Sequence, residues 1–254
     1  MPERGRLALT WIGHSTVLLE LDGRRFLTDP LLRARVAHLR RVQPIDEGDL
    51  GNLDAVLISH GHYDHLDVPS LRKLDPDVPV AGPARLSSVL RRAGRRQIVE
   101  ARVGDELTFG GVTVRATPAE HRGSGGLRRS DEALGFLLRG SASVYFAGDT
   151  DLFDGMREVA PVDLALLPVW GWGKSLGEGH LDPQRAAKAA SLLQARVAIP
   201  IHWGTYRAVH HRRDALPEPA EEFRRAAAEV APETRVEVLT PGQTLDLSSI
   251  EATS

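Results

Sequence analysis

The chain has 254 residues, of which 42% are hydrophobic and 26% are charged, so we expect a single domain over residues 1–254 with a large buried core. Lysine and arginine number 32 against 34 aspartates and glutamates, which gives no general attraction for nucleic acid, and the absence of cysteine excludes disulfides, thiolate metal ligands and thiol nucleophiles. No run reaches the roughly 18 apolar residues of a membrane span, and the first residues lack a secretory signal, so we expect a cytoplasmic protein without membrane insertion.

The first 52 residues are predicted to form three strands and a loop. Apolar and polar residues alternate over residues 7–11, and the apolar runs at 17–21 and 24–28 flank an Asp-Gly pair, which is the strongest short signal for a hairpin. Asp29 precedes a proline, which ends the third strand. We interpret residues 31–52 as a loop that is either a flap over a functional site or an irregular solvated connection.

The next part of the chain contains a histidine-rich turn. Residues 54–58 are largely apolar and predict a short buried strand, after which residues 60–65 read His-Gly-His-Tyr-Asp-His. A short helix is expected from Val68. The elements that follow are a strand at 78–81, a helix at 83–92 and strands at 97–101, 106–109 and 112–117. His121 comes just after the last of these strands.

The second half of the chain is predicted to continue with strands and two helices. Residues 134–138 and 143–147 predict a hairpin whose second strand ends just before Asp149. Asp182 and Pro183 suit the N-cap and the first position of a helix. The remaining elements are a strand at 162–167, a helix at 184–194, a strand at 196–201, a helix at 219–230 and strands near 236–239 and 244–247.

Side chains that can bind metal follow four of these predicted strands. They are His60, His62, Asp64, His65, His121, Asp149 and His202. Because strand ends converge on one rim of a sheet, we expect these side chains to meet there, although each of the last three, taken singly, could be an ordinary turn or semi-buried residue. Seven imidazole and carboxylate ligands exceed the needs of one tetrahedral zinc but suit two ions about 3.5–4 Å apart. Zn²⁺ is the expected metal, and Mn²⁺ or Fe²⁺ would accept the same ligands.

These residues resemble the metallo-β-lactamase superfamily. Residues 60–65 match its most specific motif, and the other candidate ligands and Asp29 fall in the order of its further motifs. The resemblance implies a mixed α and β (α+β) fold, built as a four-layer αββα sandwich. It also implies that His60, His62 and His121 bind the first metal, that Asp64, His65 and His202 bind the second, and that Asp149 bridges both. Asp29 would brace the histidine turn, unless it only ends its strand.

Further motifs resemble the branch that holds N-acylphosphatidylethanolamine phospholipase D and ascorbate 6-phosphate lactonase. They are Trp-Ile-Gly-His-Ser-Thr at 11–16, Thr-Asp-Pro at 28–30, Ala-Glu-His at 119–121, Gly-His-Leu-Asp-Pro at 179–183 and Pro-Ile-His-Trp-Gly-Thr at 200–205. This resemblance implies that His180 faces the substrate beside the metals, the alternative being a histidine at the start of a helix. His14 would be a substrate contact or only a turn residue that fills space.

The remaining candidate substrate contacts are aromatic and basic. Trp170, Trp172 and Trp203 would line the pocket or else pack in the core. Arg128 would bind a phosphate on the substrate or else lie in a solvated loop. A membrane-docking N-terminus like that of the phospholipase is absent, so a bulky membrane lipid is not the expected substrate.

The resemblance implies an enzyme, a dinuclear metal-dependent hydrolase. It would activate a bridging hydroxide to cleave an ester-type bond, a phosphodiester or a lactone, in a small soluble substrate that can carry a phosphate. Asp64 would also orient the nucleophile, and His180 would donate a hydrogen bond or proton to developing negative charge. The alternative is a non-hydrolytic protein that binds metal or ligand on the same fold. The sequence leaves the substrate, the metal and the oligomeric state open.

Overall fold

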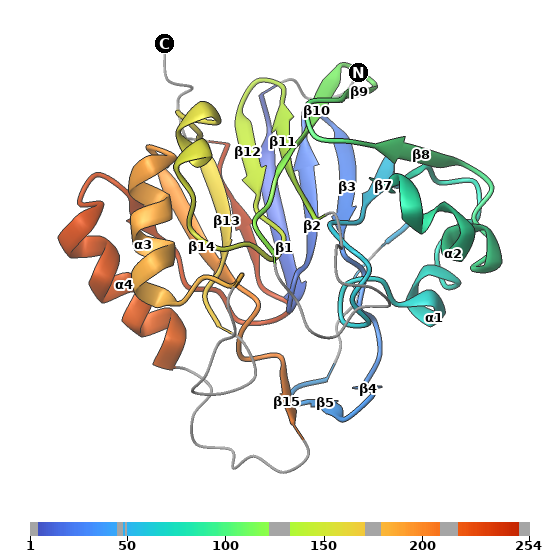
Figure 1. Cartoon of the computed structure of the whole chain (residues 1–254), viewed down its shortest axis with the longest axis horizontal. Helices are drawn as coiled ribbons and strands as arrows, with labels where there is room; N and C mark the ends of the chain where they lie inside the picture. Colours follow the sequence, from blue (N-terminus) through green and yellow to red (C-terminus); the bar gives the residue numbers. More distant parts are fainter. Residues whose placement is uncertain are drawn as a thin grey trace.

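Two seven-stranded β-sheets, stacked face to face, form the centre of the molecule, and helices cover both outer faces (Figure 1). The computed structural model describes residues 5–44, 48, 50–121, 133–170, 179–208 and 218–248. The layers run helix, sheet, sheet, helix, so the predicted four-layer sandwich of mixed α and β structure is confirmed.

The first sheet has the strand order β17-β1-β2-β3-β6-β7-β8. Its strands are Thr244–Asp246 (β17), Leu7–Gly13 (β1), Thr16–Leu21 (β2), Arg24–Thr28 (β3), Ala55–Leu57 (β6), Val80–Pro83 (β7) and Ile98–Ala101 (β8). β2 pairs antiparallel with both β1 and β3, and β6 pairs parallel with β3. The ends of β1, β3 and β6 therefore lie at the same edge of the sheet.

The second sheet has the order β16-β14-β13-β12-β11-β10-β9. Its strands are Arg235–Val236 (β16), Val197–Ile201 (β14), Leu164–Pro168 (β13), Ser143–Phe146 (β12), Leu134–Arg139 (β11), Val112–Pro118 (β10) and Glu106–Phe109 (β9). β12, β13 and β14 are parallel neighbours, and β11 pairs antiparallel with both β10 and β12. The ends of β10, β12, β13 and β14 thus share one edge.

Two pairs of helices form the outer layers. They are Val68–Leu71 (α1) and Ser87–Arg92 (α2) on one side, and Pro183–Leu192 (α3) and Glu218–Val230 (α4) on the other (Figure 1). Short 3₁₀ turns lie at Ala84–Leu86 and Asp154–Glu158. The predicted cap of α3 is confirmed, because the Asp182 carboxylate accepts a 2.8 Å hydrogen bond from the backbone N–H of Arg185. None of the helices in the described ranges is long and apolar enough to cross a membrane.

Three hydrophobic clusters fill the spaces between these layers. One lies between the two sheets, one beneath α3 and α4, and one beneath α1 and α2. β11 is buried from Leu134 to Leu138 because its two faces pack on different layers: Phe136 and Leu138 face the other sheet, and Leu137 faces the helices. Both faces of this strand are thus buried.

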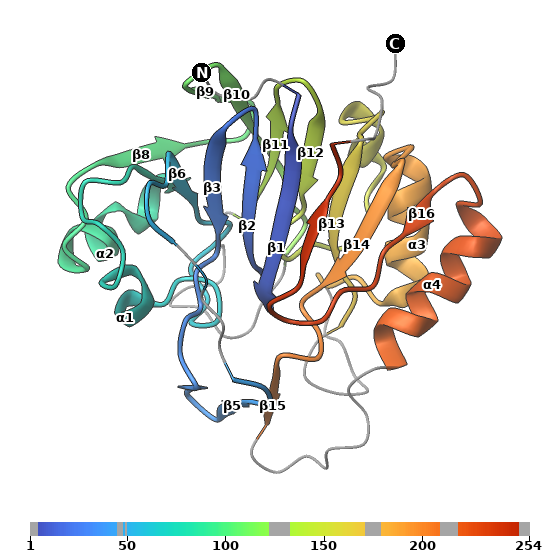
Figure 2. The same ribbon diagram turned by 180° about the vertical axis from the view of Figure 1, so that it is seen from behind.

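A third, small sheet corrects the interpretation of residues 31–52 as a loop. Arg35–Val36 (β4) and Leu39–Arg41 (β5) pair with each other, and Tyr206–Ala208 (β15) pairs with β5 below the main sheets (Figure 2). Val36, Leu39 and Tyr206 form its buried face. Strands of two or three residues are too short to show a periodic pattern, and the partner strand lies far away in the sequence.

Candidate metal centre

All seven predicted metal ligands lie at the same end of the sandwich. The first sheet supplies residues 60–65 after β6, and the second supplies His121 after β10, Asp149 after β12 and His202 after β14. Each of the seven residues is at most 9% exposed. Ligand-type atoms within 4.8 Å of one another form four overlapping groups, and every one of the seven residues belongs to at least one of them.

The first cluster is a group of three imidazoles. His62 Nδ1 lies 2.9 Å from His60 Nε2 and 3.0 Å from His121 Nε2. His121 Nδ1 donates a 2.9 Å hydrogen bond to the carbonyl oxygen of Gly179, which can only accept. The remaining nitrogen of a neutral His121 ring therefore presents its lone pair to the other two histidines.

His60 is oriented by a hydroxyl group. Ser59 Oγ donates to Asp29 Oδ2 at 2.6 Å, so it accepts at 2.9 Å from Nδ1 of His60. His60 Nε2 then presents a lone pair to the same point as that of His121. Burial is the largest cause that lowers the pKa of both His60 and His62, which favours the neutral ring that a metal needs.

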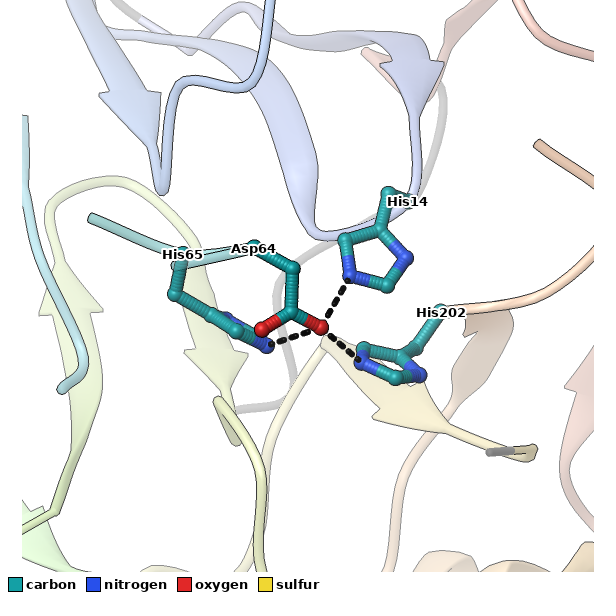
Figure 3. A group of neighbouring side chains, drawn as sticks. All are labelled: His14, Asp64, His65 and His202. Atoms are coloured by element: carbon teal, nitrogen blue, oxygen red, sulfur yellow. Dashed lines mark hydrogen bonds and ion pairs between the residues drawn. The ribbon is translucent and has the colours of Figure 1, made fainter. Parts of the chain in front are cut away.

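The second cluster surrounds one carboxylate oxygen. Asp64 Oδ2 lies 3.8 Å from Nε2 of His65 and 3.8 Å from Nε2 of His202, and 3.2 Å from Nε2 of His14 (Figure 3). Burial alone would raise the pKa of Asp64, but the neighbouring His65 and His14 outweigh it and hold the pKa below the ordinary value. The carboxylate is therefore ionised, as a metal ligand must be.

The histidines of the second cluster are fixed from behind. His65 Nδ1 donates to Asp29 Oδ2 at 2.8 Å, and His202 Nδ1 donates to the carbonyl oxygen of Trp170 at 2.6 Å. Asp29 is fully buried and also accepts a 2.7 Å hydrogen bond from the backbone N–H of Ser59. One carboxylate thus orients both ends of the histidine turn, a contact pattern typical of residues that support metal ligands.

Asp149 lies between the two clusters. Its Oδ2 is 3.2 Å from His65 Nε2, and its Oδ1 is 3.4 Å from His202 Nε2. It also belongs to one candidate ligand group with His60 and to another with His121. The charges of His202 and His65 outweigh the effect of burial and lower the pKa of Asp149 well below its ordinary value. An ionised carboxylate therefore stands within reach of both clusters.

The donor set fits divalent metal ions. His62 Nε2 and Asp149 Oδ1 are buried and have no hydrogen-bond partner among the described residues. Burial would lower the pKa of His65, yet the carboxylates of Asp149 and Asp64 raise it well above its ordinary value, which shows that these carboxylates favour a positive charge at this point, the charge that a bound cation would supply. Neutral imidazole nitrogens and ionised oxygens, with no thiolate, suit Zn²⁺, Mn²⁺ or Fe²⁺.

His180 lies on the solvent side of the centre. Its Nε2 is 3.7 Å from Asp149 Oδ2, and its ring meets that of His121 edge-on with centroids 4.7 Å apart. Its side chain is 25% exposed, whereas the candidate ligands are nearly or fully buried. A substrate that approaches Asp149 would therefore meet this imidazole.

The other predicted substrate contacts fall into different environments. Trp203 stacks on Trp11 with ring centroids 5.5 Å apart and packs against two core clusters, which is the core alternative stated for it. Trp170 is half-buried beside His202. His14 is only 1% exposed and lies behind Asp64. Trp172 and Arg128 lie outside the described residues.

Several contacts of the centre were not anticipated from the sequence. Ser59 precedes His60 directly, so its role could have been found from the motif. The carbonyl partners of His121 and His202 leave no side-chain signal, because any residue supplies a carbonyl. Asp151 is a further case, since it accepts from the backbone N–H of Gly179 at 3.2 Å and forms an ion pair with Arg185.

Comparisons with protein families and with individual relatives agree with one another. A family model described as "Beta-lactamase superfamily domain" matches residues 24–203. A protein of Caldivirga maquilingensis named "UPF0173 metal-dependent hydrolase" is 30% identical, over 94% of this chain and 97% of its own. The "N-acyl-phosphatidylethanolamine-hydrolyzing phospholipase D 1" of Caenorhabditis elegans is 31% identical, over 79% of this chain and 64% of its own.

A solved structure agrees with the sequence comparison. A metallo hydrolase from Ignicoccus hospitalis superposes with a TM-score of 0.73 at 24% identity, over 95% of this chain and 98% of that one, and this likeness concerns the fold alone. The family model covers more than half of the chain, and its match includes five of the strands whose ends carry the centre. The chain therefore belongs to the metallo-β-lactamase superfamily and, within it, to a family of metal-dependent hydrolases.

Proposed function

We propose that the protein is a dinuclear metal-dependent hydrolase that cleaves an ester-type bond, a phosphodiester or a lactone, in a small soluble substrate. The observation that carries the proposal is the position of Asp149 between two buried ligand clusters. A single ion would leave one cluster unused, and both contain enough nitrogen and oxygen donors for a separate ion.

The ligands divide between two ions, most simply Zn²⁺. His60, His62 and His121 would hold the first ion, Asp64, His65 and His202 the second, and Asp149 would be shared. Two such ions, when bound, would supply Lewis acidity and a water molecule whose pKa is lowered towards neutrality. Oriented histidines favour tight binding, because little conformational freedom remains to be lost.

The protein itself would contribute two groups to the chemistry. The partly exposed imidazole of His180 would donate a hydrogen bond or proton from Nε2 to the negative charge that develops on the substrate. The Asp64 carboxylate would also accept a hydrogen bond from the attacking water and orient it. The half-buried Trp170 would contribute part of the wall beside His202.

A phosphodiester is the first substrate class to test. The Caenorhabditis elegans relative is named for phospholipase D activity, and an enzyme so named cleaves a phosphodiester. A lactone is the second class, since the same Lewis acid and the same hydrogen-bond donor stabilise negative charge on a carbonyl oxygen.

The test measures metal content and turnover in the same preparation. Purified protein and protein reconstituted with Zn²⁺, Mn²⁺ or Fe²⁺ are assayed by mass spectrometry for metal, and with bis(4-nitrophenyl) phosphate and a simple lactone for activity. We expect two equivalents of metal and hydrolysis of one of these probes. Two bound equivalents without turnover on a broad ester panel would favour a non-hydrolytic binding protein.

His180→Ala separates chemistry from metal binding. We expect both metals to remain and kcat to fall by about 10²- to 10⁴-fold, the usual contribution of a general acid. His38→Ala, which removes an exposed histidine outside the clusters, is the matched control and should keep full activity. Unchanged kinetics in His180→Ala would remove this residue from the mechanism.

A further inference from the structure

We propose that His14 is a positioning residue that donates a hydrogen bond from Nε2 to Asp64 and thereby fixes the carboxylate of the second metal site. The inference rests on the proposed dinuclear function and gives His14 a role other than a substrate contact. It starts from the 3.2 Å distance between His14 Nε2 and Asp64 Oδ2 (Figure 3).

The surroundings of His14 exclude direct contact with a substrate in solution. The residue is 1% exposed, and its ring lies 3.9 Å from the ring of His202 and 5.4 Å from that of His65, measured between centroids. Tyr206 meets it edge-on at 5.9 Å. His14 is therefore enclosed by candidate ligands of the second site and by the small third sheet.

The direction of the hydrogen bond follows from the partner. A carboxylate oxygen accepts the hydrogen bond, so Nε2 of His14 carries the proton. With that proton in place, Nε2 has no lone pair for a metal, which makes His14 a support for Asp64 and not a further ligand.

The backbone around His14 is built to hold this orientation. His14 has a φ of 56°, which is uncommon for a residue other than glycine. Its N–H donates to Thr205 Oγ1 at 2.7 Å, and its carbonyl accepts from the N–H of His202 at 3.0 Å and from Trp11 Nε1 at 2.9 Å. Three contacts thus maintain a conformation that an isolated turn would avoid.

Arg41 closes the turn from the third sheet. Its guanidinium donates to the carbonyl of Ile12, and a Cβ atom on Gly13 would lie 2.8 Å from Arg41 Nη2 and 2.7 Å from Thr205 Cγ2. Gly13 also has a φ of 132°, a left-handed backbone that favours glycine, so another residue there would be both strained and crowded. We infer that the third sheet holds the β1–β2 turn against the proposed second metal site.

The contacts of His14 predict an effect on one site only. The turn is bonded to Asp64 and to His202, which belong to the second site, and no described ligand group joins it to His60, His62 or His121. Removing the hydrogen bond should weaken the binding of the second ion and leave the affinity for the first ion unchanged.

The experiment compares His14→Asn with His14→Gln. Both amide side chains tolerate the turn better than a branched side chain. The side chain of asparagine is too short for its amide nitrogen to reach Asp64, whereas the amide nitrogen of glutamine lies near the position of His14 Nε2. Stepwise Zn²⁺ titration of the apoprotein against a chromophoric chelator reports both constants. We expect His14→Asn to weaken the second constant by about 10- to 100-fold, and His14→Gln to recover most of the loss.

Each outcome of the titration has a distinct meaning. Wild-type protein that binds fewer than two Zn²⁺ would refute the dinuclear function itself. Two equivalents with an unchanged second constant in His14→Asn would overturn only the role of His14. Equal weakening of both Zn²⁺ constants in both variants would show that His14 is merely structural and would also overturn its proposed role. The same conclusion would follow if the melting temperature of the apoprotein shifted equally in both variants. The absorption spectrum of Co²⁺ in the second site should change in His14→Asn and return in His14→Gln.

Discussion

Asp149 lies between the two clusters of candidate metal ligands. Its two oxygens face different histidines, and it belongs to ligand groups on both sides of the centre. His62, in contrast, belongs to the first cluster alone. The two residues therefore differ in what their loss would remove, although both are buried and both follow strand ends.

Substitution of these two residues tests whether Asp149 is a ligand of both metal ions and His62 a ligand of only one. Asp149→Ala is expected to weaken both metal constants, and His62→Ala only the first, because the second cluster keeps all its donors. Metal titration of each apoprotein is the measurement, with circular dichroism as the check on folding. Equal effects of the two variants on both constants would contradict the division of ligands.

Among the structural elements, the segment before Asp149 controls how the sheets meet at the centre. Gly148 has a φ of 62°, and a Cβ there would lie 2.7 Å from Cβ of Ser59 and 3.0 Å from the carbonyl oxygen of Leu134. Ser59 directly precedes His60. The strand ends from the two sheets thus touch at a point where only glycine fits.

Gly148→Ala should therefore misplace two ligand segments. We expect a loss of about 2–4 kcal/mol in the free energy of unfolding, from the left-handed backbone and the overpacked contact, and weaker binding of metal. Gly48→Ala is the control, because its φ is 58° and a Cβ there would meet no described atom within 4 Å; it should cost about 1 kcal/mol and leave metal binding intact. Urea unfolding of both variants gives the comparison, and equal losses would refute the contact argument.

A second element, the start of α3, positions the segment that carries His180. Arg185 forms an ion pair with Asp151 and lies 3.5 Å from the carbonyl oxygen of His180, and Asp151 accepts from the N–H of Gly179. The same glycine accepts the hydrogen bond of His121. One ion pair thus supports both a ligand and the proposed proton donor.

Arg185→Met should lower kcat by roughly 10- to 100-fold, as expected when a catalytic group is misplaced by about an ångström, while two metals stay bound. Arg196→Met, which removes an ion pair with Asp163 away from the centre, is the matched control and should keep its activity. Rate measurements at saturating substrate, paired with metal analysis, show whether kcat falls while both metals stay bound. A rate equal to that of the control would show that the ion pair does not position His180.

At the scale of the whole molecule, the centre joins the two halves of the sandwich. The first sheet contributes the histidine turn and His14, and the second contributes His121, Asp149 and His202. Bound ions would therefore link the sheets and stabilise the folded state, since the unfolded chain lacks the assembled site.

Removal of metal should consequently lower the melting temperature. A ligand present at 100 times its Kd adds about 2.7 kcal/mol, which corresponds to about 5–11 °C per site in a domain of this size. Differential scanning calorimetry before and after dialysis against a chelator measures the shift, and added Zn²⁺ should restore it. A chelated protein that melts at the original temperature would contradict the proposed link between the sheets.

The sequence predicted most strands and their ends because these follow from local patterns, whereas the four layers were implied by the family resemblance. Buried strands, the Asp22-Gly23 hairpin and the cap at Asp182 are each encoded within a few neighbouring residues. The histidine turn could be recognised for the same reason. The assignment of each ligand to an ion stays a prediction.

What the sequence could not predict depends on contacts between distant segments. β5 and β15 pair across more than half of the chain, the carbonyl partner of His202 comes from Trp170, and His14 is turned inward by a left-handed backbone that no pattern indicates. Such contacts form only when the two sheets pack, so periodicity carries no trace of them.

The central claim is that one carboxylate is shared by two metal ions. Anomalous diffraction from crystals of the Zn²⁺-loaded protein, recorded on both sides of the zinc absorption edge, tests it most directly. We predict two peaks about 3.5–4 Å apart, with the carboxylate of Asp149 between them. A single peak, or two peaks of which only one lies within bonding distance of Asp149, would contradict the claim.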